Sequence, residues 1–145
     1  MSTAKDLTQE APTSPRVRTN GYAILARMAD KGRAVIAGTQ GDFHFDCPLD
    51  NMLFGFKGVA GTDVRKQLES GASNADIAAW LDANGDPKTE EEKIAWSDGI
   101  EAARPYDIPE KKDWFIEACG EAGCDPATST LFDYLEADDK TTFAK

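Results

Sequence analysis

Signals that start and stop α-helices recur at short intervals along the chain, and they constrain the fold more than any other feature. Ser73 with Asp76, and Thr89 with Glu92, match the capping box, in which two side chains satisfy the first backbone N–H groups of a helix. Helix stop signals follow at Gly38, Gly71, Gly85 and Pro105. The sequence therefore predicts an all-α fold, a small bundle of about five or six helices.

The first helix is predicted from about Asn20 to Gly38, where apolar residues recur at helical spacing. We expect its apolar arc to pack against the helices that carry Trp80, Trp96 and Trp114. Further along, the alternation of Phe43 and Phe45 leaves room for one short β-hairpin. A last helix is expected to open at Asp125-Pro126.

The domain organisation is expected to be simple. Residues 1–14 are polar and offer almost nothing to bury, which is typical of a disordered arm. Residues 15–145 have the length of a single helical domain that needs neither disulfide nor metal to hold its core. An odd count of three cysteines and the lack of an export-like leader favour reduced thiols in the cytoplasm.

Charge is distributed unevenly over a chain whose net charge is −10. Residues 1–70 carry nine Lys and Arg against eight Asp and Glu, whereas residues 71–145 carry seven against eighteen. Nucleic acids and anionic lipids both require an excess of basic residues, so neither partner is expected. No apolar run reaches the length of a membrane span.

No metal or cofactor is predicted. Asp82, Asn84 and Asp86 resemble the start of a calcium loop, but Pro87 and Lys93 occupy the positions that should hold glycine and glutamate. The cysteines and His44 lack the paired spacing of a structural zinc site. The segment 14–38 also lacks the glycine spacing of a nucleotide-binding loop.

The segment 14–38 is basic on an otherwise acidic chain, and it supplies the candidate ligand-binding residues. Arginine grips carboxylate or phosphate through a planar fork, so this segment suggests an anion pocket. The alternatives are a solvent-exposed face of salt bridges, or contacts with the acidic half of the same chain. The candidates for the pocket are Arg16, Arg18, Tyr22, Arg27, Lys31 and Arg33.

Catalysis is left open, with three candidate residues, His44, Cys47 and Asp30. His44 is a candidate general base, because histidine as a residue type titrates near neutrality. Cys47 precedes Pro48 at a helix start, where backbone N–H groups favour a thiolate. Beside Arg27 and Asp30, these two residues suggest a small enzyme. A histidine between two phenylalanines is nevertheless more often a packing residue.

Several of these residues also carry a resemblance to a known family. They are Ser14-Pro15-Arg16, Gly21-Tyr22, Leu25, Arg27, Asp30-Lys31, Arg33-Ala34, Phe43, Phe45, Cys47-Pro48-Leu49-Asp50, Ile77 and Trp80. Through them the chain resembles a bacterial family known only as domain-of-unknown-function family 5069. The family pattern would place alanine at position 32, where this chain has Gly32. A glycine inside a helix disfavours it, so the first helix could be interrupted there. The resemblance implies no activity.

The resemblance does single out two blocks. The first block is Arg27, Asp30, Lys31 and Arg33, and the second block is residues 44–50. A site is best sought where these blocks meet. The leading hypothesis is a binding or adaptor module that recognises an acidic small molecule or an acidic protein segment through its Arg- and Lys-bearing helix. The alternatives are the small enzyme and a homodimer formed through an exposed apolar helix face.

Overall fold

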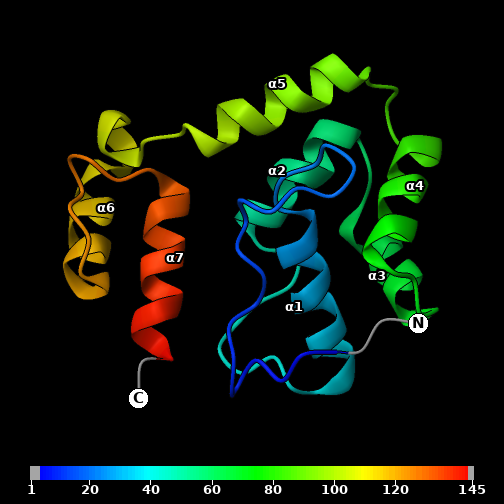
Figure 1. Ribbon diagram of the computed structural model, residues 1–145, viewed down its shortest axis with the longest axis horizontal. Coiled ribbons are helices and arrows are strands. Elements are labelled where there is room, and N and C mark those ends of the chain that lie inside the picture. Colours follow the sequence, from blue (N-terminus) through cyan, green and yellow to red (C-terminus); the bar gives the residue numbers. More distant parts are fainter. Residues whose placement is uncertain (1–3, 144–145) are drawn as a thin grey trace. The chain divides into compact units, whose positions relative to one another are not determined.

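The structure is a computed structural model that describes residues 4–143, and its regular structure is helical throughout. Seven α-helices and one short 3-10 helix form within these residues, one or two α-helices more than expected, and no strand does. The all-α prediction is therefore confirmed. The helices are α1 (Leu25–Ala37), α2 (Pro48–Lys57), α3 (Gly61–Glu69), α4 (Asn74–Asn84), α5 (Glu90–Glu101), η1 (Pro105–Asp107), α6 (Pro109–Ala122) and α7 (Leu131–Thr142) (Figure 1). No described helix is long and apolar enough to cross a membrane.

The chain divides into two compact units, Met1–Ser97 and Asp98–Lys145. In the first unit α1 contacts α2, α3 and α4, and α3 contacts α4. In the second unit α6 packs against η1 and α7 (Figure 1). The boundary between the units falls within α5.

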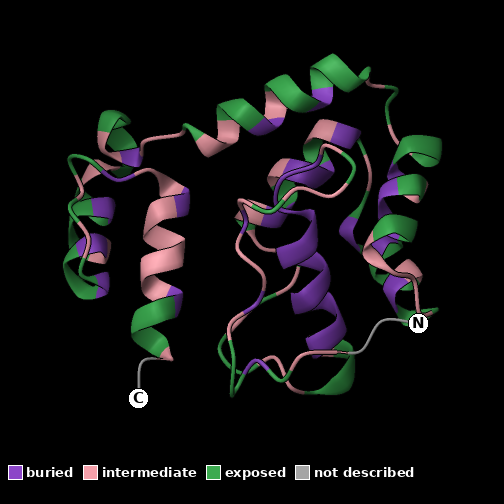
Figure 2. Cartoon of the chain, in the orientation of Figure 1, coloured by how far each residue is buried: buried purple, intermediate pink, exposed green. Residues whose placement is uncertain are grey.

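Helix α1 is the centre of the first unit, and ten consecutive residues, Leu25 to Ala34, are buried (Figure 2). The helix ends as predicted at Gly38, whose φ of 77° is left-handed. It runs unbroken through Gly32, at which a side chain would collide with Leu68. Leu25, Met28 and Ala29 of its apolar arc are buried, whereas Ile36 near its end is 40% exposed.

The predicted start of α1 near Asn20 is wrong. Asn20, Gly21 and Ile24 all have positive φ, which a right-handed helix excludes. The Ile24 N–H donates instead to the Pro15 carbonyl at 2.9 Å, and Thr19 pairs with Tyr22 through two backbone hydrogen bonds. Helix α1 therefore begins at Leu25.

The capping boxes are confirmed at Ser73 and Thr89, where each hydroxyl accepts from the third residue of its helix and that residue's side chain accepts in return. The last helix differs from its prediction, because α7 begins at Leu131 rather than Asp125. Its cap is Thr130, which forms a third capping box with Asp133. The pattern Thr-x-x-Asp was present in the sequence and competed with the proline signal.

The expected hairpin is absent among residues 4–143, and residues 43–45 lie in a loop between α1 and α2. Its two phenylalanines make side-chain contacts instead of pairing strands. Phe45 lies 6.0 Å from the ring centroid of Phe54 and close to Gly32. Phe43 lies 5.8 Å from the Arg27 guanidinium.

The N-terminal segment, as far as the structure describes it, packs against the rest of the first unit. Residues 1–3 of the expected disordered arm lie outside the described residues, but residues 4–14 make specific contacts. The Leu7 N–H donates to the Thr39 carbonyl at 2.8 Å, and the Leu7 side chain is 2% exposed. One buried leucine and these backbone bonds fix a segment whose composition is otherwise polar.

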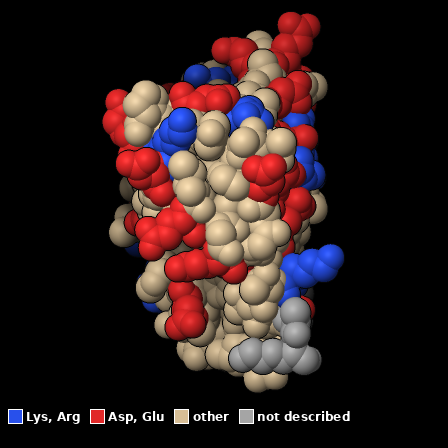
Figure 3. Space-filling model, turned by 90° about the vertical axis from the view of Figure 1, so that its left-hand side faces the viewer, with Lys and Arg blue, Asp and Glu red and all other residues tan. Residues whose placement is uncertain are grey.

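The second unit is smaller and more acidic. Residues 98–145 contain twelve Asp and Glu against five Lys and Arg. Phe115, Cys119 and Ala122 of α6 and Phe132 of α7 are buried. Figure 3, which views the side on which α6 lies, shows Asp and Glu spread over the visible face. A narrow apolar core thus supports a charged exterior.

Candidate functional site

The two blocks that carry the family resemblance meet at Lys31, Cys47 and Asp50. The Lys31 ammonium lies 3.0 Å from Asp50 Oδ1 and donates to Cys47 Sγ at 3.1 Å. Lys31 is 4% exposed and Asp50 is 0% exposed, whereas Cys47 is half-buried. A buried ammonium therefore joins a buried carboxylate to a cysteine that solvent reaches.

The local sequence around Cys47 explains how this thiol is placed. Cys47 is the N-cap of α2 in an extended conformation, and Pro48 occupies the first helical turn. Asp50, in the same turn, accepts from the Asp46 N–H through Oδ2 at 3.0 Å. Asp46 has a φ of 63°, a left-handed conformation that turns the chain sharply into the helix. The Cys47 sulfur is thereby held beside Lys31 of α1.

Asp50 carries a substantial desolvation cost. Burial raises the pKa of its carboxyl, although the nearby Lys31 charge and backbone N–H groups lower it in part. Oδ1 lies 3.0 Å from the Lys31 ammonium, which makes a buried ion pair between α1 and α2. A buried charge of this kind is tolerated only with such a partner.

The other charges of the first block are bound inside the first unit. Asp30 accepts from the Thr13 N–H at 2.7 Å and from the Thr13 hydroxyl at 2.5 Å. Arg33 donates to Asn74 Oδ1 at 2.8 Å and to the Ala72 carbonyl at 3.1 Å. Burial lowers the pKa of Arg33, and the Asp30 charge partly offsets this effect. Neither residue lies on the solvent-exposed salt-bridge face that the helical pattern suggested.

Tyr22 is likewise an internal residue. It is 0% exposed, and its hydroxyl donates to Asp82 at 2.5 Å. Burial is the largest of the effects that raise its pKa, followed by the Asp82 hydrogen bond. Lys93 lies over the Tyr22 ring at 4.4 Å and 3.3 Å from Asp82. This cluster ties α4 and α5 to the turn before α1.

Three of the six predicted ligand-binding residues bind separate groups inside the first unit. Tyr22, Lys31 and Arg33 contact three different side chains, which are Asp82, Asp50 and Asn74. Arg27 is 4% exposed and lies over Phe43, while Arg16 and Arg18 are half-buried. The catalytic candidates are also separated in their contacts, because Cys47 contacts Lys31 while Asp30 contacts Thr13.

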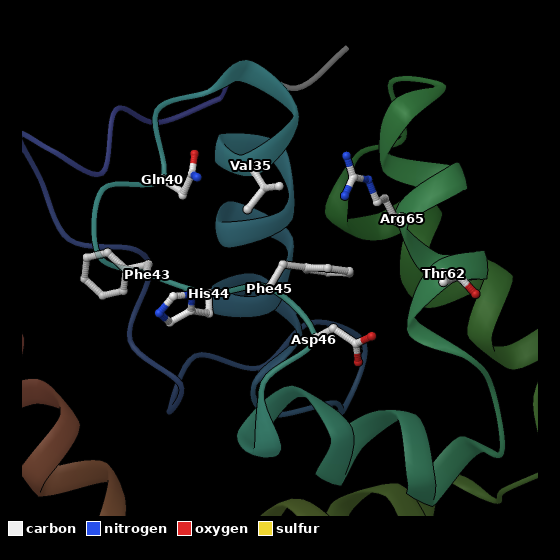
Figure 4. A pocket seen from close by; sticks show the side chains of 8 residues that line it. All are labelled: Val35, Gln40, Phe43, His44, Phe45, Asp46, Thr62 and Arg65. Carbon is white, nitrogen blue, oxygen red and sulfur yellow. The ribbon is translucent and has the colours of Figure 1, made fainter.

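A depression of about 330 Å³ opens beside α1 and α3, next to the second block. Figure 4 shows Arg65 extending from α3 toward Val35 of α1, with Phe45 pointing into the space between the two helices. The loop after α1 contributes most of the remaining wall, including His44. The lining residues are Val35, Gln40, Phe43, His44, Phe45, Asp46, Thr62 and Arg65.

Several polar groups of this depression lack a protein partner. The side chains of Gln40, His44 and Thr62 make no hydrogen bond with any described residue. Arg65 forms an ion pair with Glu69, in which Nε lies 3.5 Å from the Glu69 carboxylate on the exposed side of α3. Asp46 differs, because its carboxylate accepts from Asn51 at 2.8 Å.

Sequence reasoning missed Arg65, and it placed Asp50 in the second block without giving it a role. Asp50 was visible as an acidic residue in the first turn after a capping cysteine, but nothing in the pattern placed Lys31 beside it. Arg65 was one basic residue on a short amphipathic helix. Its position beside the loop after α1 depends on how α1 and α3 pack.

Metal ligands do not cluster in the described part of the chain, where no group of three His, Cys, Asp or Glu residues is suitably placed. The segment that resembles a calcium loop is used differently. Asp82 accepts from Tyr22 and Asn20, and Asn84 donates to the Trp80 carbonyl.

Comparison with known proteins agrees with the resemblance seen in the sequence. No curated protein matches the chain significantly. One protein family does match, and its profile covers residues 9–141, nearly the whole chain. The chain therefore belongs to the family described as Domain of unknown function (DUF5069).

Proposed function

We propose that the first unit is a binding module for a small acidic molecule, which it takes into the depression beside α1 and α3. The observation that carries this proposal is the combination of about 330 Å³ of space with a guanidinium at its wall. Small-molecule sites occupy roughly 300–1,000 Å³ and combine apolar walls with a few polar groups. Val35 and Phe45 supply such walls here.

Arg65 is the residue that would hold the acid group. Its pair with Glu69 is exposed on both sides, with 45% and 49% of the two side chains accessible. Exposed pairs of this kind contribute about 0–1 kcal/mol, so an incoming carboxylate displaces Glu69 at little cost. A bidentate bond to the ligand is stronger because it is charge-assisted and geometrically matched.

The surrounding charges support a small ligand rather than an acidic protein segment. Asp46 also lines the depression, but its carboxylate is directed to Asn51 and packs against Gly61 at the start of α3. A large acidic segment would meet the net charge of −10 of the whole chain. A single carboxylate that carries an apolar group meets mainly Arg65, His44 and the apolar walls.

The test is titration of benzoate into the full chain, followed by amide chemical shifts. Saturable shifts are expected at residues 40–46 and 62–65, with weaker effects from inorganic phosphate and none from neutral benzamide. Arg65→Gln should weaken benzoate binding by about tenfold or more, because hydrogen bonds to charged groups contribute about 1.5–3 kcal/mol. Lys66→Gln is the matched control, since it removes the same charge from the next residue of α3.

Three results would contradict the proposal. The first is the absence of saturable shifts in the loop after α1 with every carboxylate. The second is equal weakening by Arg65→Gln and Lys66→Gln, which would mean that benzoate responds only to general charge. The third is binding of benzamide as strongly as benzoate, because the proposed contact requires the carboxylate.

A further inference from the structure

Two of the three cysteines meet at the end of α6, in the second unit. Gly123 ends this helix with a left-handed φ of 81°. The Cys124 N–H then donates back to the Cys119 carbonyl at 3.0 Å, and the Gly123 N–H donates to the same carbonyl at 2.8 Å. A backbone bond of this kind after a left-handed glycine is typical of the Schellman motif, which often brings the side chains of the two bonded residues into contact.

This backbone bond limits the separation of the two cysteines. With standard bond lengths, the 3.0 Å bond from the Cys124 N–H to the Cys119 carbonyl keeps the two Cα atoms within about 7 Å of each other. Cysteines joined by a disulfide usually have Cα atoms about 4.4–6.8 Å apart. The backbone therefore already holds both residues near the separation that a disulfide requires.

The two thiols also point to the same place. Burial raises the pKa of the Cys119 thiol, which reaches about 12 with the contribution of the neighbouring Cys124 thiol. Burial is also the largest of the effects that raise the pKa of Tyr134 in α7, followed by the Asp138 charge, and both thiols contribute to it. Two sulfur atoms that act on each other and on one tyrosine lie on the same side of the helix end.

We propose that Cys119 and Cys124 form a redox modification site, at which a low-molecular-weight disulfide converts the two thiols into an intramolecular disulfide. Both are free thiols in the structure. Cys124 is half-buried and Cys119 is 0% exposed, so the reagent meets Cys124 first. Cys119 then acts as the resolving thiol. Its attack is intramolecular, because the end of α6 holds it beside Cys124.

The reaction balances with the small disulfide as the only co-reactant. The Cys124 sulfur attacks one sulfur of the reagent, whose S–S bond breaks, and the first small thiol leaves with the Cys124 proton. The Cys119 sulfur then attacks the Cys124 sulfur of this mixed disulfide, and the second small thiol leaves with the Cys119 proton. The protein loses two electrons, and the reagent gains them as it becomes two thiols.

The product ties the end of α6 to the segment that leads to α7. A thiol with a raised pKa is a poor leaving group, so a reductant that attacks Cys124 expels Cys119 slowly. A reductant cannot easily attack Cys119 itself, because that residue is buried. The oxidised form should therefore persist longer than a mixed disulfide at an exposed cysteine.

The experiment equilibrates the full chain with oxidised and reduced glutathione, alkylates the remaining thiols and analyses tryptic peptides by mass spectrometry. Cys119 and Cys124 lie in one tryptic peptide, residues 113–140, whereas Cys47 lies in another, residues 34–57. The first peptide should lose two hydrogen atoms and take up no alkylating reagent. Cys47 is the internal control, and it should react with the alkylating reagent or carry glutathione.

Two glycine variants test whether the end of α6 brings the thiols together. A methyl group at Gly123 or at Gly120 meets no described atom within 4 Å, but only Gly123 has a positive φ. Because a left-handed conformation disfavours a side chain, Gly123→Ala should lower the equilibrium constant for disulfide formation by about fivefold. Gly120→Ala is the matched control and should leave this constant unchanged. Equal effects of the two variants overturn the geometric basis of the proposal.

The unmodified chain decides the proposal without any variant. If Cys124 ends at equilibrium as a mixed disulfide with glutathione, Cys119 does not reach its sulfur and the proposal fails. Cys119→Ala removes the resolving thiol, so this variant should stop at that mixed disulfide. A Cys119→Ala chain that takes up no glutathione at Cys124 would overturn the order of the two steps.

Discussion

Helices α1 and α6 have almost the same length and belong to different units. Most residues of α1 are buried, whereas most residues of α6 are not. Helix α1 is buried over ten consecutive residues, including Arg27, Asp30, Lys31 and Arg33. Helix α6 buries Phe115, Cys119 and Ala122 and leaves Trp114 51% exposed. Both sequences are rich in charge, so charge content alone does not indicate which helix lies at a core.

This difference shows that the free-energy cost of burying a charged side chain depends on whether another element provides a partner for it. In α1 each buried charge has a fixed partner, such as Asp50 for Lys31 and Asn74 for Arg33. Removing one partner of a buried pair leaves an uncompensated charge, whereas removing an exposed charge changes little. Substituting the partner of a buried charge in α1 should therefore lower stability far more than substituting an exposed charge of α6.

The largest effect is expected from Asp50→Ala. This change leaves the Lys31 ammonium buried without its carboxylate, which costs about 3–5 kcal/mol in the free energy of unfolding. Asp113→Ala on α6 is the matched control, because Asp113 is exposed, and it should change stability by less than about 0.5 kcal/mol. Urea denaturation measures both, and amide hydrogen exchange should show lost protection in α1 but not in α6.

A cost for Asp50→Ala no greater than that for Asp113→Ala would remove the distinction between the two helices. The double variant Lys31→Met with Asp50→Leu sharpens the same point. It should recover most of the lost stability, because well-packed apolar residues often replace a buried ion pair without loss.

An intermediate effect is expected from Tyr22→Phe, which deletes the hydrogen bond to Asp82. The loss should be about 1 kcal/mol, below the usual range for bonds to charged groups because the Asp82 side chain is 40% exposed. Tyr134→Phe in the second unit is the matched control. The Tyr134 hydroxyl makes no hydrogen bond to a described residue, so that substitution should be nearly neutral.

The effect of Tyr22→Phe should depend on pH. Burial is the largest influence on Asp82 and raises its pKa, but hydrogen bonds from Tyr22 and Lys93 and nearby positive charges outweigh burial and lower it below 3.8. A lowered carboxyl pKa stabilises the fold above pH 3.8 and loses this contribution as the pH falls through the folded-state value. The difference between Tyr22→Phe and the unmodified chain should shrink below about pH 4. A constant difference from pH 3 to pH 7 would argue against the Asp82 bond as its cause.

The smallest effects are expected from one substitution made in both helices. Gly32→Ala places a methyl group against Leu68 and Phe45, and overpacking of about 1–3 kcal/mol should outweigh a helix-propensity gain of about 1 kcal/mol. Gly120→Ala in α6 meets no atom within 4 Å and should stabilise by about 0.5–1 kcal/mol. Thermal unfolding of the two variants should therefore shift in opposite directions.

The same sign for both glycine variants would mean that α1 accommodates a larger residue as easily as α6. Adding Leu68→Val to Gly32→Ala tests the cause directly. If the Leu68 methyl group is the obstacle, the double variant should regain part of the stability that Gly32→Ala loses.

Local signals predicted much of the fold, because they depend on residues that are neighbours in the sequence. The capping boxes at Ser73 and Thr89 and the left-handed stop at Gly38 all act within one helical turn. The start of α1 was misplaced because Ile24 adopts a left-handed conformation that its β-branched side chain disfavours. Its N–H bond to the Pro15 carbonyl joins residues that no periodicity relates.

For the same reason, the sequence predicted some residues of the candidate sites but not the contacts between them. Cys47 was a candidate because it precedes a helix start, and Lys31 was a candidate because it lies in a basic segment. Their contact, and the buried Asp50 that fixes it, arise from the packing of α1 against α2. Arg65 became a candidate only when α3 was placed beside the loop after α1.

The sequence by itself determined that this chain is helical, where most of its helices start and stop, and to which family it belongs. These properties follow from short-range hydrogen bonding, from helical periodicity and from motif residues. Only the tertiary structure decided that the charged face of α1 lies inside the first unit while the charges of α6 remain exposed. The physical reason is that burial of a charge requires a partner from another element, and helical periodicity within one segment does not specify that partner.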